Sequence, residues 1–177
     1  IYTQMVDASG SPVMCENVWI SYFTGGRDNM GEGYGKLTAG YGSRGVPTER
    51  GEKIGPEFTF GIYAQKALNE PILIIKTAWG GKSIHTDFRP PSAGPYVFNE
   101  GELENFRRRG KDLREVKAEK AEQTGKFYGL MMDHVRKVLS DVKRVYPGYN
   151  EEKGYELAGF VWFQGWNDMV ASGTYPN

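Results

Sequence analysis

The sequence has little that would place it in a specialised class of protein. Its single cysteine, Cys15, cannot form a disulfide within the chain, which excludes a disulfide-stabilised scaffold. No apolar run approaches the roughly 20 residues that a membrane-spanning helix needs. Lys and Arg number 22 and Asp and Glu number 22, so the basic excess of general nucleic-acid binders is absent. We therefore expect partners that are small molecules or proteins, with no nucleic acid and no membrane span.

What is present fits an ordinary globular protein. With 177 residues, 39% of them hydrophobic and 14% aromatic, the chain can bury a sizeable core, and we expect one domain over residues 1–177. The histidines and the cysteine lack the spacing of a metal site, so we expect neither a metal nor a cofactor. The first residues, IYTQMVDASGSP, lack the basic start and apolar centre of a signal peptide, and the compartment stays open.

Three short apolar runs, at residues 17–23, 71–76 and 158–163, predict buried strands, because none alternates cleanly with polar residues. Pro56 and Glu57 suit the first turn of a helix before the second run. Apolar residues recur at helical spacing over residues 127–145, which predicts an amphipathic helix before the third run. Strands separated by helices favour an α/β fold, a three-layer sandwich whose strands are adjacent and parallel.

Glycines and amides follow two of these predicted strands. TAWGGKS contains Gly80 and Gly81, and QGWND contains Gln164, Gly165 and Asn167. Ligands gather beyond the carboxyl ends of parallel strands, and exposed glycine N–H groups beside a neutral amide donor are typical of an oxyanion hole. Two ordinary turns would also explain the glycines.

Two stretches carry a family resemblance: residues 49–94, which include TAWGGKSIHTDFRPP, and YELAGFVWFQGWNDM near the end. They resemble the sialate O-acetylesterase-like domain of the SGNH (GDSL-type) hydrolase superfamily, which includes carbohydrate acetylesterases. The resemblance extends from about residue 17 onward and implies a flavodoxin-like α/β/α fold with a parallel sheet. It implies that Gly80 or Gly81 is the oxyanion glycine and that Gly165 to Asp168 form the Gly-x-Asn-Asp block.

Relatives in the acetylesterase branch carry Gln-Gly-Glu at this block, so Gln164 and Gly165 match while Trp166 replaces the acid. The resemblance therefore implies that either Gln164 or Asn167 could be the side-chain oxyanion donor. The resemblance implies an enzyme that removes acetyl or similar short acyl groups from an acetylated carbohydrate through a serine acyl-enzyme. It also makes a secreted or periplasmic location plausible.

The family's Gly-Gln-Ser nucleophile block and its Asp-x-x-His block do not occur in the sequence. We expect both to lie outside residues 1–177, so that this chain alone is inactive. Ser83 and His85 are substitutes in principle, but near neighbours in a turn rarely reach the required geometry. Ser43 lacks the first glycine of a nucleophile elbow. His134 lies on the apolar face of its predicted helix, as a packed core histidine would.

Two other functions deserve comparison. GGKS resembles the end of a phosphate-binding loop, but the first glycine of that motif would fall at Lys76, which argues against it. A non-catalytic carbohydrate-binding or scaffold domain with a hydrolase fold would explain the missing blocks. For either carbohydrate function, the candidate substrate contacts are Trp166, Lys82, Ser83, Asp87 and Arg89. The last two alternatively pair with each other to hold a rigid loop.

Overall fold

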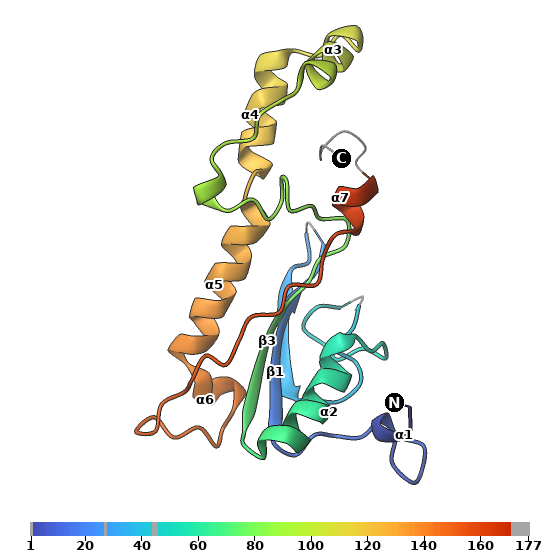
Figure 1. The fold of residues 1–177 in the computed structure, drawn as a ribbon, viewed down its shortest axis with the longest axis vertical. Helices are drawn as coiled ribbons and strands as arrows, with labels where there is room; N and C mark the ends of the chain where they lie inside the picture. Colours follow the sequence, from blue (N-terminus) through green and yellow to red (C-terminus); the bar gives the residue numbers. More distant parts are fainter. Residues whose placement is uncertain (1, 27, 44–45, 171–177) are drawn as a thin grey trace. The chain divides into compact units, whose positions relative to one another are not determined.

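The computed structural model describes residues 2–26, 28–43 and 46–170, which form two compact units. The first unit contains residues 1–79 and 134–157, and the second contains residues 80–133 and 158–177. The elements follow in the order α1 (Tyr2–Met5), β1 (Val18–Thr24), β2 (Gly31–Lys36), α2 (Pro56–Leu68), β3 (Ile72–Thr77), a 3-10 turn η1 (Pro91–Ala93), α3 (Glu100–Arg108), α4 (Leu113–Gln123), α5 (Lys126–Ser140), α6 (Val142–Val145) and α7 (Trp166–Val170), as Figure 1 shows.

The sheet of the first unit has the order β2-β1-β3. β1 and β3 run parallel with Val18 opposite Ile72, as the sequence predicts for two strands joined through a helix. β2 pairs antiparallel with β1, so the expectation of a purely parallel sheet is wrong. The α/β class is confirmed, with a mixed sheet among the described residues.

The side chains of β1 alternate between two buried faces. Val18, Ile20 and Tyr22 pack against Phe58 and Ile62 of α2, where the main apolar core lies. On the opposite face, Trp19 stacks at 4.1 Å on the ring of Tyr146, just after α6, and Ser21 contacts His134 of α5. A strand buried on both faces has no need of polar residues in alternate positions, which explains why β1 is apolar apart from Ser21 and Thr24.

α2 and α5 confirm the two helices that the sequence predicts. α2 begins with Pro56 at its first turn and ends at Asn69, which adopts a left-handed φ of 53°. The amphipathic pattern over residues 127–145 forms two helices rather than one. Asp141 interrupts it, because its side chain accepts a hydrogen bond from the N–H of Arg144 and caps α6.

The second unit is mostly helical in the part that the structure describes. A capping box starts α3, with Asn99 accepting from the N–H of Glu102 and Glu102 accepting from the N–H of Asn99. Asp112 caps α4 through the N–H of Arg114. The charged segment ENFRRRGKDLREVKAEKAEQ lies within this pair of helices, and neither helix carries a fully buried residue.

Residues 158–163 do not form the expected third strand. They are irregular, and Phe160, Val161 and Phe163 are 74%, 75% and 89% exposed. Apolar composition permits a buried strand but supplies no neighbouring strand to pair with, and pairing decides whether such a run becomes one. The prediction of a third adjacent parallel strand is therefore wrong.

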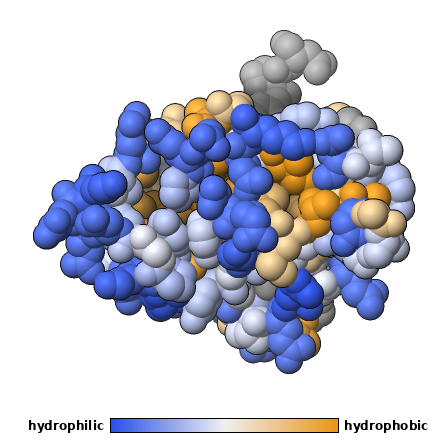
Figure 2. Space-filling model, turned by 90° about the horizontal axis from the view of Figure 1, so that it is seen from below, coloured by the Kyte–Doolittle hydropathy of each residue, from blue (hydrophilic) through white to orange (hydrophobic). Residues whose placement is uncertain are grey.

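Hydrophilic and apolar side chains are both exposed on the surface (Figure 2). Figure 2 shows one face on which apolar areas lie between hydrophilic side chains. Among the described residues, no helix is both long and apolar enough to cross a membrane.

Candidate functional site

The candidate site lies within the second unit, where residues 80–83 meet residues 164–168. The first segment follows β3 by a few residues and turns at Gly81, whose φ of +68° is a left-handed conformation that favours glycine. A Cβ added at Gly80 or Gly81 would meet no atom within 4 Å. Both glycines are exposed, so their backbone is open to approach by a ligand.

The QGWND motif forms the start of α7, not the end of a strand. Gly165 accepts the first hydrogen bond of this short helix, from the N–H of Met169. Gln164 donates through Nε2 to the carbonyl of Lys82 at 2.8 Å, and Asn167 donates through Nδ2 to the carbonyl of Gly81 at 3.0 Å. The amide side chains predicted to converge with the glycines therefore do lie against them.

The two amides differ in how many of their hydrogens are in use. Gln164 Nε2 also donates to Asp168 Oδ2 at 2.7 Å, so both of its hydrogens have acceptors. A flipped amide would place its oxygen against two oxygens, which fixes this orientation. Within the described part of the chain, Asn167 Nδ2 donates to the Gly81 carbonyl alone, which leaves a second hydrogen available. Of the two amides, Asn167 is therefore the one with a hydrogen that a ligand could accept.

The glycine segment itself has spare donors. Among the described residues, the N–H groups of Gly80 and Gly81 donate to no acceptor, and the Gly81 carbonyl is bound to Asn167. The N–H of Lys82 points away from Asn167, because N–H and C=O of one trans peptide point in opposite directions. We call the N–H groups of Gly80 and Gly81 and the amide of Asn167 the donor cluster. Such a cluster suits an anion or a developing oxyanion.

Asp168 holds the two segments together. Its carboxylate, in a residue that is 6% exposed, accepts from the N–H of Ile84 at 2.9 and 3.0 Å and from the N–H of His85 at 3.2 Å. With Gln164 on Oδ2, the charge is surrounded by donors, as a buried carboxylate requires. The sequence placed Asp168 in the Gly-x-Asn-Asp block without assigning it a role.

Ser83 and Asp87 shape the loop that follows. Asp87 Oδ2 accepts from the N–H of Ser83 at 2.9 Å and from its hydroxyl at 3.2 Å, while Lys82 Nζ lies 3.5 Å from Asp87 Oδ1 and over the ring of Phe127. Because the Ser83 hydroxyl faces a carboxylate, His85 does not activate it as a nucleophile. Apart from the contact with Phe127 of α5, these contacts are internal to the loop.

Arg89 stiffens the same loop by a different route. Its guanidinium donates to the carbonyls of Gly94 at 2.8 Å and Ala93 at 2.7 Å. The interpretation that Asp87 and Arg89 pair with each other is therefore wrong, although both hold the loop.

His85 packs edge-on against Tyr96, with the ring centroids 4.8 Å apart, and its pKa is lowered, first by burial and then by Arg89. Trp166 is 73% exposed beside the donor cluster's Asn167 and is open to a ligand.

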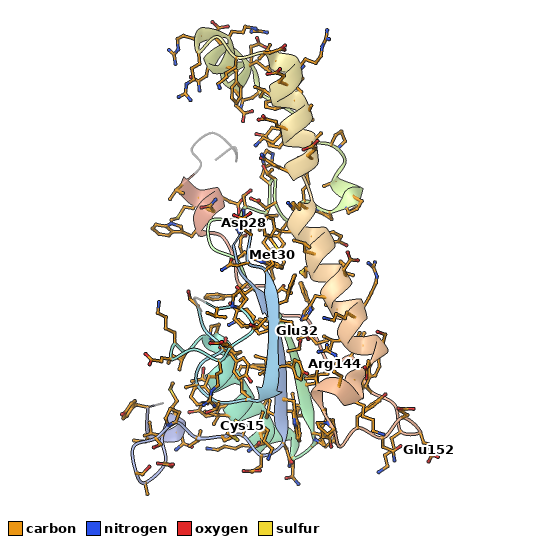
Figure 3. All side chains as sticks on the ribbon, turned by 180° about the vertical axis from the view of Figure 1, so that it is seen from behind. Cys15, Asp28, Met30, Glu32, Arg144 and Glu152 are labelled. Carbon is orange, nitrogen blue, oxygen red and sulfur yellow. The ribbon has the colours of Figure 1, made fainter. Side chains whose placement is uncertain are left out.

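A second polar cluster, which the sequence did not reveal, lies in the first unit. Ser21 Oγ donates to Glu32 Oε1 at 2.7 Å and lies 3.0 Å from His134 Nε2. Glu32 also binds Arg144 and Lys137, each at 2.7 Å, and Figure 3 shows Glu32 on β2 beside Arg144. We call these five residues the Ser21 cluster. The sequence shows His134 on the apolar face of a helix and Ser21 within an apolar strand, and both are unusual positions for polar residues. It does not show that the two side chains contact each other.

The Ser21 cluster contains a serine, a histidine and a carboxylate but is not a catalytic triad. Ser21 is fully buried, at 0% exposure, and its single hydroxyl proton is directed at Glu32. Burial would raise the pKa of Glu32, but the hydrogen bonds from Arg144, Lys137 and Ser21 lower it to about 2. Burial lowers the pKa of His134. The cluster therefore joins β1, β2, α5 and α6 as a structural network.

Among the described residues, no group of three or more His, Cys, Asp and Glu side chains is placed to hold a metal ion. Comparison of the chain with models of known protein families, with curated proteins and with solved structures finds no match.

Proposed function

We propose that this chain supplies the oxyanion hole of an ester hydrolase that removes acetyl or similar short acyl groups. The observation that carries the proposal is the donor cluster. Among the described residues the N–H groups of Gly80 and Gly81 donate to no acceptor, both glycines are exposed, and the half-buried Asn167 amide lies against the Gly81 carbonyl with one hydrogen to spare. Spare neutral donors suit the negatively charged oxygen of a tetrahedral intermediate.

In this proposal Asn167 is the side-chain donor and Gln164 supports the glycine turn. The acyl-enzyme forms on a serine, with a histidine as base, and both come from sequence beyond residues 1–177. Ser83, two positions from His85, and Ser21, whose Oγ lies 3.0 Å from His134 Nε2, each donate their hydroxyl proton to a carboxylate. The three-layer α/β/α arrangement of SGNH hydrolases belongs to the same proposal.

An acetylated carbohydrate is the substrate that the family resemblance implies. The exposed indole of Trp166 supports it, because aromatic faces stack on sugar rings and this side chain lies next to the proposed donor in sequence. A non-catalytic carbohydrate-binding domain would use the same side chain without needing the donor cluster, and the two functions make different predictions for Asn167.

The test compares Asn167→Ala with Gln164→Ala in the whole protein, including the sequence that flanks residues 1–177. With an acetylated sugar as substrate, Asn167→Ala should lower kcat by about 100- to 1000-fold, the usual effect of losing an oxyanion donor. Gln164→Ala should cost less, because its hydrogens bind the Lys82 carbonyl and Asp168. Equal turnover in the unsubstituted protein and a folded Asn167→Ala variant would reject the proposed function.

A further inference from the structure

Asp168 makes contacts that an acidic residue in the first turn of a five-residue helix does not need. Its two oxygens accept from the N–H groups of Ile84 and His85 in a segment about 80 positions earlier in the chain. The same carboxylate accepts from Gln164, whose other hydrogen binds the Lys82 carbonyl. The buried carboxylate of Asp168 therefore connects the start of α7 to the segment that follows the two glycines.

These contacts fix the glycine segment at successive peptides. Asn167 donates to the Gly81 carbonyl and Gln164 donates to the Lys82 carbonyl. A little further along the chain, Asp168 accepts from the N–H groups of Ile84 and His85. The peptide planes after Gly81 are thereby held at both ends of the turn. The Gly81 N–H belongs to the preceding peptide, which these contacts do not touch, so they act on its direction only through the backbone angles of Gly81, whose φ is +68°.

Resting on the proposed function, we infer that Asp168 is a positioning residue for the oxyanion hole. Its carboxylate sets the placement of the glycine N–H groups against the Asn167 amide, and it takes no part in proton transfer. The residue is 6% exposed and both oxygens already accept hydrogen bonds, so it has no access to a substrate. Misplacing reacting or stabilising groups by about 1 Å costs up to about 100-fold in rate.

The chain offers a matched control in Asp112, which also accepts a main-chain N–H, from Arg114 at 2.7 Å, within the same unit. Asp168→Asn keeps the shape of the side chain but places an amide N–H₂ against donors. Asp168→Ser keeps one acceptor oxygen and removes the charge. Asp112→Asn makes the same chemical change at a cap away from the donor cluster.

The experiment measures kcat and KM of the whole protein on an acetylated sugar, together with amide hydrogen exchange. Asp168→Asn and Asp168→Ser should each lower kcat by about 10- to 100-fold while KM stays within about threefold. The Ile84 and His85 amides should exchange at least about 10-fold faster, since they lose a charged acceptor. Asp112→Asn should change neither kcat nor the exchange of these amides.

A second readout separates positioning from general stability. In an Asn167→Ala background, Asp168→Asn should cost a markedly smaller factor in kcat than it does alone, because the donor that it helps to place is gone. Equal factors in the two backgrounds, or unchanged exchange at Ile84 and His85, would overturn the inference. If Asn167→Ala lowers kcat and the Asp168 variants do not, only the role of Asp168 fails. If Asn167→Ala has no effect, the proposed function fails, and the inference with it.

Discussion

The Ser21 cluster and the donor cluster are both assembled from residues far apart in the sequence, but their hydrogen bonds differ in kind. In the Ser21 cluster, three donors, from Ser21, Lys137 and Arg144, surround the Glu32 carboxylate, in which both oxygens are engaged. In the donor cluster, the Gly81 carbonyl is bound, while the N–H groups of the exposed Gly80 and Gly81 donate to no acceptor among the described residues. The residue types of a catalytic triad occur in the first cluster, and the spare donors that we propose for an oxyanion hole occur in the second.

Residue types alone therefore do not identify a site. Whether its donors and acceptors are already hydrogen-bonded within the protein decides whether they are available to a ligand. A buried network in which each charge is matched stabilises one arrangement of strands and helices. Donors left over at an exposed turn cost little in the absence of a ligand, because water binds them, and they are available when a charge develops. The following predictions test whether the two clusters divide in this way.

The largest effect on stability is expected from Glu32→Ala. It removes the acceptor of Ser21, which is fully buried, and of Arg144, so we expect a loss of about 2–4 kcal/mol in the free energy of unfolding. Glu104→Ala, which breaks an exposed pair with Arg107, should change it by less than about 0.5 kcal/mol. Urea denaturation of both variants measures the difference. Similar losses for the two would show that the Ser21 cluster is no stronger than a surface ion pair.

Glycines of the two units should respond differently to an added methyl group. A Cβ at Gly61 of α2 would lie 2.0 Å from Cδ2 of Leu37, which is fully buried, so Gly61→Ala should destabilise the protein by about 1–3 kcal/mol. Gly80→Ala meets nothing within 4 Å and should change stability by less than about 0.5 kcal/mol. Thermal unfolding of both variants checks this contrast, which an equal shift in Tm would contradict.

A smaller effect is expected from pH. The folded-state pKa of His134 lies below its ordinary value of 6.5, so the unfolded chain binds more protons as the pH falls and stability declines from about pH 6.5 downward. The folded-state pKa of Glu32, about 2, lies below 4.5, which adds a further loss as the pH falls from about 4.5 towards 2.

The substitution His134→Gln separates these two contributions, because it keeps a donor for Ser21 and does not titrate. The urea midpoint of the unsubstituted protein should fall between pH 7 and pH 5, and that of the variant should fall less. The same slope in both proteins would show that His134 is not responsible.

Local sequence patterns predicted the elements that depend on local or strongly apolar signals. β1, β3, α2 and the helical pattern of α5 were found, because apolar runs and Pro56 carry their signals within a few residues. β2 was missed, since its sequence GEGYGK has no strand pattern of its own and its pairing with β1 defines it. Residues 158–163 show the converse, a strand-like sequence without a partner strand among the described residues.

For the candidate site, the sequence identified the residues but not their division of roles. Gly80, Gly81, Gln164 and Asn167 were chosen as donors from their types and positions, and the contacts with Gly81 and Lys82 bring them together. Which amide has a free hydrogen depends on Asp168 and on carbonyl directions, which no spacing encodes. The Ser21 cluster was missed for the same reason, since it joins Ser21 to a histidine 113 positions away.

The most direct test of the donor cluster observes its hydrogens while an oxyanion is present. A phosphonate ester that reacts with the catalytic serine that we propose for the whole protein would leave a tetrahedral, negatively charged adduct, and NMR follows the assigned amide signals. We predict that the Gly81 N–H, or the Gly80 N–H, and the Asn167 side-chain amide shift downfield as they donate to the adduct, while the Gln164 amide does not. An adduct that leaves the Gly80, Gly81 and Asn167 signals unchanged would contradict the account.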